Sequence, residues 1–386
     1  MNPGRILTTH VGSLPRPQRV VDHLFAQDSG QGFDRAGFEA TMREEVDNVV
    51  ALQTQSQVDV VSDGEMSKIS YATYIRHRLT GFELGLMPRA VPSDLDDFPD
   101  FKERLAKLGA TPQYHRPLCR GPIAVKDLSG LHQDIENLLA ACLKAGVTRA
   151  FMNSASPGVI AVFQPNEYYS SHETYLEALA EAMSTEYETI VAAGLELQID
   201  APDLAMGRHI KFRDVDDTEF LRNAHLQVEA LNHALRNVPA ERTRMHVCWG
   251  NYEGPHHHDI GLEKILGVVL QAKPATVLFE GANPRHQHEW EVWAEAGKKG
   301  SIPDHKILAP GVIDSVNNFI EHPRLIAQRL KTYAQIVGRE RVMAASDCGF
   351  GTFAGFGAVH PSIAYAKLKS MAEGAGMASQ ELWSRA

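Results

Sequence analysis

The chain has 386 residues, with 38 Lys or Arg against 48 Asp or Glu, so its formal net charge is −10. This charge argues against a dedicated nucleic-acid-binding protein, because neutralising phosphates requires clustered basic surface. Hydrophobic residues make up 44% of the chain and charged residues 22%, which excludes extensive disorder and allows a large core. The sequence contains no uncharged apolar run of about eighteen residues and no signal-peptide-like start. We therefore expect a cytoplasmic protein with no membrane or nucleic-acid partner.

Short β-branched or apolar runs alternate with longer amphipathic runs, a pattern typical of a parallel sheet with helical connections. In chain order, the predicted strands are 6–11, 58–62, 121–125, 148–152, 195–199, 244–248, 276–279, 307–313 and 341–345. The clearest predicted helices are 33–55, 174–193, 218–236, 323–338 and 362–374. This is one strand too many for an eight-stranded barrel. Either the first segment crosses the mouth of the barrel or one segment lies outside the ring.

Residues 85–120 interrupt this alternation with a segment rich in Pro and Asp, followed by a short helical pattern. The segment predicts an insertion, with a lid and an oligomer contact as its two interpretations. No internal repeat or linker indicates a second domain. We therefore predict an α/β fold: a single (β/α)8 TIM-like barrel over residues 1–386, with an insertion around residues 85–120.

Unusual polar residues follow the predicted strands one after another. They are Ser13, Glu65, Asn153, Asp200, His246, Cys248, Glu280 and Cys348. The carboxyl ends of parallel strands form one rim of a barrel, and the active sites of such barrels lie there. We therefore expect these side chains to meet at one cavity.

His246 and Cys248 are two residues apart on a predicted strand, so their side chains point to the same face. A buried pair without a metal explains these two residues at least as well. Cys348 and Glu280 at later strand ends favour the metal, because two thiolates, an imidazole and a carboxylate suit tetrahedral zinc. The chain has 4 cysteines, too few for a disulfide scaffold, and we expect a reducing environment.

Seven short motifs occur in the order found in the catalytic barrel of cobalamin-independent methionine synthase and its shorter relatives, a family that this chain resembles. They are TTHVGS at 8–13, DGE at 63–65, QIDAP at 198–202, HVC at 246–248, FEG at 279–281, GVID at 311–314 and DCG at 347–349. The resemblance implies that the zinc ligands are His246, Cys248, Glu280 and Cys348. It also implies that Ser13 holds the carboxylate of an amino-acid substrate and that Glu65 and Asp200 hold its ammonium group.

The chemistry of zinc and thiols supports the same division of roles. A free thiol is mostly protonated at pH 7, whereas a thiol that coordinates zinc is deprotonated and ready to attack an alkyl group. We therefore predict a methyltransferase that moves an alkyl (methyl) group to a thiol acceptor, with homocysteine giving methionine as the leading interpretation. The expected partners are a small-molecule thiol acceptor and an alkyl donor, and a homo-oligomer stays open.

The sequence departs from the family at three points. Its length leaves no room for the additional N-terminal barrel of full-length methionine synthases, so we expect a short, core-only relative. The family's proton-donating His after the GVxD motif is Ser315 here, which leaves Asp314 and His256 as weak catalytic candidates. A donor-stacking Trp is replaced by Phe163 and two tyrosines. The donor therefore stays open among a folate, a methylated corrinoid and a sulfonium compound.

Three other functions compete with the leading one. A related barrel adds the thiol of coenzyme M to an epoxide, which would require a basic anchor for the sulfonate such as Arg16, Lys68 or Arg208. A barrel with a closed structural zinc could bind a ligand without turnover. A metal-free lyase or decarboxylase predicts that the His and Cys residues of the rim bind no metal.

Overall fold

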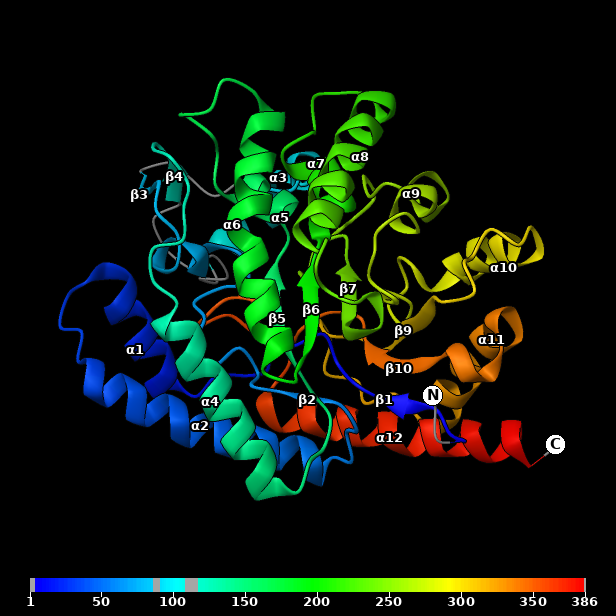
Figure 1. Cartoon of the computed structure of the whole chain (residues 1–386). Helices are drawn as coiled ribbons and strands as arrows, with labels where there is room; N and C mark the ends of the chain where they lie inside the picture. The colour runs from blue at the N-terminus through cyan, green and yellow to red at the C-terminus, as the bar shows by residue number, and fades with distance from the viewer. Residues whose placement is uncertain (1–3, 86–90, 108–116, 385–386) are drawn as a thin grey trace.

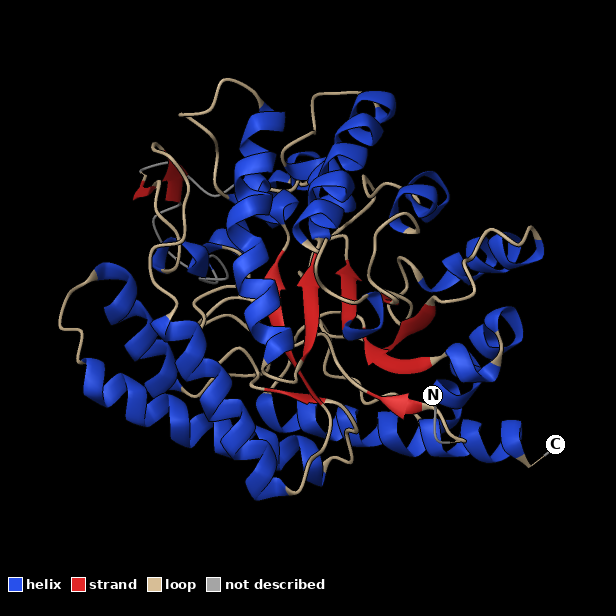
Figure 2. Ribbon diagram, in the orientation of Figure 1, coloured by secondary structure: helices blue, strands red, loops and turns tan. Residues whose placement is uncertain are grey.

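The structure is a computed structural model that describes residues 4–85, 91–107 and 117–384 (Figure 1). Eight strands form one sheet in the order β1-β10-β9-β8-β7-β6-β5-β2, and every pair of neighbours in it is parallel. The strands are β1 (Leu7–Thr8), β2 (Val61–Ser62), β5 (Ala150–Ala155), β6 (Glu196–Asp200), β7 (Thr243–Val247), β8 (Thr276–Phe279), β9 (Ile307–Ile313) and β10 (Met343–Ser346). Figure 2 shows these strands at the centre, with helices around them.

The first and last strands of this order, β1 and β2, are held together by hydrogen bonds. The amides of Asp59 and Val60 donate to the carbonyl of Thr8 at 3.2 and 3.1 Å, and the Thr9 hydroxyl donates to the carbonyl of Val60 at 3.2 Å. These contacts bring the two edges of the sheet against each other. The predicted TIM-like barrel is confirmed.

The interior of the barrel is filled by side chains from the strands and the residues beside them. One buried cluster comprises Leu7, Val11, Val60, Phe151, Leu278, Ala309, Met343 and Ala345. The guanidinium of Arg244 lies 3.9 Å from the centre of the Phe151 ring and donates to the carbonyl of His10 at 3.0 Å. Because strands of such a barrel are covered on both faces, they contain few exposed residues. All residues of β5, β7 and β8 are buried.

The ninth predicted strand, 121–125, is wrong, and it is the segment that lies outside the ring. Residues 121–125 form no strand and follow a separate antiparallel pair, β3 (Phe82–Leu84) and β4 (Pro117–Cys119). This pair joins the two ends of the predicted insertion. Gly121 and Pro122 supply few side chains to a sheet, and Pro122 cannot donate a ladder hydrogen bond. The other eight predicted strands overlap strands of the barrel, although β1 and β2 are shorter than expected.

Twelve α-helices lie in the described part of the chain. They are α1 (Gln18–Ser29), α2 (Arg35–Gln55), α3 (Pro99–Lys107), α4 (Ser129–Ala145), α5 (Pro157–Phe163), α6 (His172–Ala192), α7 (Gly207–Ile210), α8 (Asp217–Ala234), α9 (Leu262–Val269), α10 (Trp290–Lys298), α11 (Pro323–Val337) and α12 (Pro361–Trp383). The 3-10 helices are η1 (Thr73–His77), η2 (Ser93–Asp97), η3 (Pro202–Leu204), η4 (Ala240–Arg242), η5 (Gln287–Glu289) and η6 (Arg339–Arg341). Each predicted helix matches one of them within a few residues at its start.

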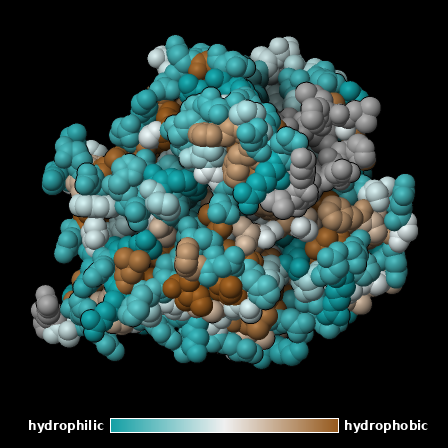
Figure 3. All heavy atoms as spheres, turned by 180° about the vertical axis from the view of Figure 1, so that it is seen from behind, coloured by the Kyte–Doolittle hydropathy of each residue, from teal (hydrophilic) through white to brown (hydrophobic). Residues whose placement is uncertain are grey.

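Most helices present an apolar side to the sheet. In α6, for example, Tyr175, Leu179, Met183 and Tyr187 recur at helical spacing and are fully buried. Seen from behind, the surface is mainly hydrophilic, with apolar side chains in separate patches (Figure 3). Among the described helices, none is both long and apolar enough to cross a membrane.

Asp59 stabilises the closure of the barrel. Its Oδ2 accepts hydrogen bonds from the amide and hydroxyl of Thr8 at 2.9 and 3.1 Å and from Arg5 at 2.8 Å. We predict that Asp59→Ala lowers the free energy of unfolding by about 1–3 kcal/mol, because buried donors lose their partner. Glu39→Ala, which removes only an exposed pair with Arg35, is the control and changes it little. Equal denaturation midpoints for both variants would contradict this role.

Candidate metal centre and its cavity

One cavity lies at the carboxyl ends of the barrel strands. Six of the residues that sequence analysis placed on the rim line it, and they come from five different strand ends: Ser13, Glu65, Asp200, His246, Cys248 and Cys348. Asp200 ends β6, His246 lies in β7, and the others follow their strands within a few residues. The shared direction of parallel strands thus brings together side chains that lie more than 300 residues apart in sequence.

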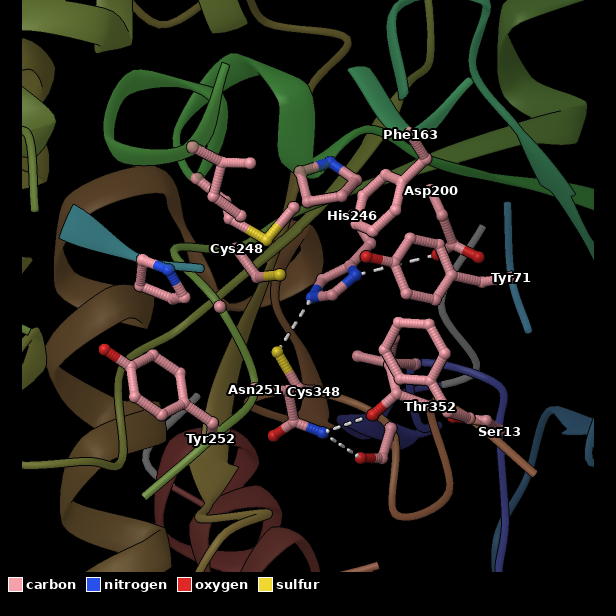
Figure 4. Close-up of a pocket in the computed structure, with 18 of the residues that line it drawn as sticks. Ser13, Tyr71, Phe163, Asp200, His246, Cys248, Asn251, Tyr252, Cys348 and Thr352 are labelled. Atoms are coloured by element: carbon pink, nitrogen blue, oxygen red, sulfur yellow. Dashed lines mark hydrogen bonds and ion pairs between the residues drawn. The ribbon is translucent and has the colours of Figure 1, made fainter. Parts of the chain in front are cut away.

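The imidazole of His246 and the thiols of Cys248 and Cys348 form a candidate metal centre. One ligand atom from each of these three residues lies within 4.8 Å of the others, and all three side chains are buried. The Nε2 of His246 is 3.7 Å from the Sγ of Cys348. Figure 4 shows both sulfurs on the same side of the His246 ring. His246 lies in β7 and Cys248 directly follows it, two residues further on, while Cys348 follows the end of β10, and these positions account for the convergence.

The three groups strongly influence one another's protonation. Burial, together with Cys248, raises the pKa of the Cys348 thiol well above its usual value. The hydrogen bond with Cys348 lowers the pKa of Cys248 despite burial. Burial is the largest single effect on His246 and disfavours its charge, but Cys248, Asp200 and the Asp347 carbonyl together outweigh burial and raise the pKa of His246 to about 9. These groups compete for protons in a buried space, which is the environment in which a divalent cation can replace protons.

Asp200 orients the His246 ring. The two residues are direct neighbours in the β6–β7 register, and the Oδ1 of Asp200 lies 3.6 Å from the Nδ1 of His246. Nε2 faces Cys348 and also lies 3.1 Å from the carbonyl of Asp347. A carboxylate beside the other ring nitrogen is the arrangement that orients a metal-binding His. The other oxygen of Asp200, Oδ2, accepts from the side-chain amide of Asn153 at 2.9 Å.

Glu280 lies beside the metal centre, but its carboxylate is engaged elsewhere. It accepts hydrogen bonds from the Trp249 amide at 2.8 Å, the Asn283 amide side chain at 2.6 Å and Arg285 at 2.5 Å. Burial works against its ionisation, but Arg285 and His286 outweigh burial and lower the pKa of Glu280. Among the described residues, the ligand atoms that meet at the centre come from His246, Cys248 and Cys348 alone. A ligand role for Glu280 stays a prediction.

Glu65 and Asp200 present unpaired carboxylate oxygens to the cavity. The Oε2 of Glu65 and the Oδ1 of Asp200 are buried and accept no hydrogen bond. Burial and the neighbouring Asp200 raise the pKa of Glu65 to about 8. Glu65 has a positive φ of 56°, and its carbonyl accepts from Arg16 at 2.8 Å, which fixes the loop after β2. A cationic group between the two acids would satisfy both oxygens.

Close backbone packing holds Ser13 beside the metal centre. A Cβ on Gly349 would lie 1.9 Å from the Ser13 hydroxyl, and Gly12, with a φ of 141°, would similarly collide with Asn153. Both positions therefore require glycine. The Phe350 amide donates to the Ser13 carbonyl at 2.8 Å and ties the loop after β1 to the loop that carries Cys348.

Asp347 is a supporting residue to which sequence analysis gave no role. Its carboxylate accepts hydrogen bonds of 2.8 Å from the amides of Gly281, Ala282 and Asn283. These bonds fix the loop after β8 against the residue that precedes Cys348. The DCG motif was the only sequence signal for this role.

The two weak catalytic candidates, Asp314 and His256, contact other protein groups and stabilise loops near the cavity. Asp314 accepts from the Val316 amide at 2.8 Å and from Asn317 at 2.5 Å, so its carboxylate organises the loop after β9. His256 is buried against the Tyr252 ring, with ring centres 4.2 Å apart. Neither is among the described residues that line the cavity, whereas Tyr252 is.

The insertion reaches this cavity through η2. Asp94 is fully buried, and its Oδ2 accepts from the hydroxyl of Tyr252 at 2.5 Å and from the amide of His256 at 2.6 Å. At the surface, Asp97 pairs with His257 and His258 at 2.8 and 3.0 Å. The histidine tract therefore serves as the contact surface for the insertion.

Sequence analysis missed several residues of the cavity wall. Tyr71, Phe163 and Phe353 form an aromatic group in which Tyr71 lies 5.6 and 5.7 Å from the other two ring centres. His209 of α7 also lines the cavity. These residues lie in loops and short helices outside the quoted motifs, so no periodic pattern marks them. Among these residues, the sequence analysis named only Phe163, as one of the aromatic residues found where the family has a donor-stacking Trp.

The architecture and the centre thus define a (β/α)8 barrel with a candidate His/Cys/Cys metal site at its carboxyl rim. The family described as cobalamin-independent synthase, catalytic domain, matches residues 6–94. The methionine synthase of Saccharolobus solfataricus is 24% identical over 380 residues, 97% of this chain and 95% of that protein. The methionine synthase of Thermococcus kodakarensis is 24% identical over 378 residues, 97% of this chain and 94% of that protein.

Solved structures show the same fold. A B12-independent methionine synthase from Shewanella sp. W3-18-1, in complex with selenomethionine, has a TM-score of 0.74 at 16% identity, covering 98% of this chain and 99% of that one. A putative vitamin-B12-independent methionine synthase from Listeria monocytogenes has a TM-score of 0.66 at 17% identity, covering 97% and 98%. The resemblance to the cobalamin-independent methionine synthases is confirmed, and it extends over nearly the whole chain.

Asp94 tests the contact between the insertion and the cavity wall. We predict that Asp94→Ala destabilises the insertion by about 1–3 kcal/mol, because the amide of His256 and the Tyr252 hydroxyl lose a buried acceptor. Limited proteolysis would then cleave within 91–107 several-fold faster than in the wild type. Asp100→Ala, at an exposed position of α3, is the control. Unchanged cleavage in Asp94→Ala would show that the contact does not hold the insertion.

Proposed function

We propose that this protein is a zinc-dependent methyltransferase that transfers a methyl group to the thiol of homocysteine and forms methionine. The observation that carries the proposal is the meeting of His246, Cys248 and Cys348 in the cavity that Glu65 and Asp200 also line. Such a cavity can hold an amino acid by its ammonium group and place its side-chain sulfur at a metal. We further propose that the chain acts as a single barrel domain.

Zinc fits the donor atoms of the centre best. Two thiols and one imidazole are soft and borderline ligands, which favour zinc over magnesium, calcium or manganese. Three converging protein ligands leave a position for a substrate atom, as in catalytic rather than closed structural zinc sites. When bound here, zinc would lower the pKa of a coordinating thiol, so that the acceptor sulfur attacks as a thiolate.

The protein's own residues would position the acceptor. Glu65 and Asp200 offer the buried, unpaired oxygens that an ammonium group can satisfy. Ser13, which lies below Asp200 in Figure 4, would donate its hydroxyl to the substrate carboxylate. Asp200 would act on both substrate and metal, because it also lies beside the Nδ1 of His246. The selenomethionine in the Shewanella structure supports an amino-acid ligand for this fold.

The geometry favours homocysteine over a sulfonate-bearing thiol such as coenzyme M. The candidate basic anchors are all committed to the protein: Arg16 donates to the Glu65 carbonyl at 2.8 Å, Lys68 to the Asn153 carbonyl at 2.5 Å and Arg208 to Asp217 at 3.0 Å. None of these three is among the described residues that line the cavity. The acids that do line it would repel a sulfonate.

The wall formed by Tyr71, Phe163 and Phe353 gives the methyl donor an aromatic surface beside the metal centre. Such a surface can contact a flat ring system or a cationic methyl group, so it fits more than one of the donors considered above. The reaction requires Cys248 and Cys348 to stay reduced. We therefore propose that the enzyme works in the cytoplasm.

The zinc site can be tested with one substitution. We predict that purified wild-type protein contains about one zinc per chain and that Cys348→Ser contains almost none, because a ligand thiolate is lost. Cys142→Ser, which changes a buried cysteine of α4 outside the cavity, should keep its zinc. Elemental analysis decides the result. Full zinc in Cys348→Ser would refute the site.

Glu65 makes substrate binding depend on pH. With a pKa of about 8, Glu65 is mostly protonated at pH 7 and must ionise to bind an ammonium group. Calorimetric titration with methionine should therefore give a Kd that falls by up to about tenfold per pH unit below pH 8 and then levels off. In Glu65→Gln, binding should be weaker and should vary less with pH. The same pH dependence in both proteins would refute this role.

A further inference from the structure

His209 is a buried histidine in the cavity wall for which the proposed function has no role. It lies in α7, which follows η3 after the end of β6. Its side chain is 1% exposed and lines the same cavity as His246, Cys248, Glu65 and Asp200. His209 therefore shares a cavity with the candidate metal centre without being one of its ligands.

The two nitrogens of His209 have different surroundings. Both nitrogens are buried and neither makes a well-aligned hydrogen bond, but Nδ1 lies 2.9 Å from the Oδ1 of Asp259. A carboxylate at this distance favours the tautomer with the proton on Nδ1, which leaves the lone pair of Nε2 free. An imidazole held in this way by a carboxylate is the arrangement of a general base, and the carboxylate stabilises the imidazolium that forms.

Asp259 is itself held firmly. Its Oδ2 lies 3.0 Å from the Nδ1 of His256 and 3.0 Å from the Nε2 of His286, and the guanidinium of Arg285 is 3.9 Å away. Its Oδ1 faces His209. His256 shares this carboxylate but is not among the described residues that line the cavity, so it offers a matched comparison for His209.

Methyl transfer to a thiol involves two proton movements. The thiol must lose a proton before its sulfur attacks, and the leaving nitrogen of an amine-type donor such as a folate must gain one. Ser315, which follows the GVID motif, cannot serve as the acid, because its hydroxyl already donates to Asn251 at 2.9 Å and is not appreciably acidic. Among the described residues that line the cavity, His209 offers a buried ring nitrogen without a hydrogen-bond partner.

We propose that His209 transfers the proton in this reaction. Its Nε2 takes the proton from the thiol as the sulfur becomes a thiolate. The sulfur then forms a bond to the methyl carbon while the bond from that carbon to the donor breaks, and the electron pair stays on the donor's leaving atom. When that atom is the nitrogen of an amine-type donor such as a folate, it takes the proton from Nε2 of His209, and the products are one thioether and one protonated amine. When the donor is a sulfonium compound, it leaves as a neutral thioether and Nε2 gives the proton to water. In both cases His209 returns to its neutral form.

The proposal rests on the proposed function, but its test needs no methyl donor. The zinc-loaded protein is titrated at pH 7 with homocysteine and, separately, with 2-aminobutyrate, which has the same amino-acid group but no thiol. Calorimetry in two buffers of different ionisation enthalpy gives the number of protons released with each ligand. The number of protons released with homocysteine minus the number released with 2-aminobutyrate gives the thiol proton alone. The proton that Glu65 loses on binding an ammonium group is the same for both ligands and cancels.

In the wild type this difference should be close to zero, because His209 keeps the proton. In His209→Asn the difference should rise to about one proton per chain, since a thiol is protonated at pH 7 when free. Asn retains a donor that can face Asp259 but lacks Nε2. His256→Asn should behave as the wild type. Zinc content and thermal unfolding show that each variant is folded.

Three results would overturn the proposal. A full proton released to buffer by the wild type, or the same small difference in His209→Asn, would show that another group handles the proton. Equal behaviour of His256→Asn and His209→Asn would assign the effect to the Asp259 cluster as a whole. If 2-aminobutyrate binds and homocysteine adds no zinc-dependent affinity, the proposed function itself fails, and the role of His209 with it.

Discussion

The structure depends on one electrostatic constraint, which is that several acidic groups are buried together around the carboxyl rim of the barrel. Cys248 and Cys348 lie close to Glu280, and Asp200 and Glu65 face the adjoining cavity. Burying an anion without a partner is costly, so each of these groups requires positive charge or donors. The way in which each is satisfied separates the residues that support the site from those left for metal and substrate.

Some of the acids are satisfied by the protein itself. Glu280 has Arg285, and Asp347 has three amides of the loop after β8. These bonds fix loops against one another and keep the strand ends in place. The two thiols share the single imidazole of His246, and the Oε2 of Glu65 and the Oδ1 of Asp200 accept no hydrogen bond. A zinc ion and an ammonium group would supply charge at these two places, which is why we assign metal and substrate there.

The insertion and the loops add what the strands cannot provide. The strands bring donors to the rim, but a barrel rim is open on one side. The contact of Asp94 with Tyr252 and the His256 amide places η2 over the loop after β7, and Pro92 beside it lines the cavity. Segments distant in sequence thus enclose a site in which electrostatic interactions are stronger than in water.

Much of this organisation could be predicted from the sequence, and the reason is geometric. Strand ends of a parallel barrel share one rim, so the positions of Asp200, His246 and Cys348 after apolar runs were sufficient to bring them together. The segment 121–125 was misassigned because a short apolar run can belong either to a strand or to a loop that packs over other residues, and its pattern is the same in both cases. His209 and Asp347 were missed because their roles depend on contacts with segments far away in sequence. For Glu280, position at the rim did not reveal its competing bonds to Arg285 and Asn283.

The central claim is that the acceptor sulfur joins His246, Cys248 and Cys348 at zinc. X-ray absorption at the zinc edge, recorded with and without homocysteine, tests it directly. The account predicts two sulfur ligands in the protein alone, from Cys248 and Cys348, and a third sulfur after homocysteine is added. An unchanged sulfur shell with saturating homocysteine would contradict the account.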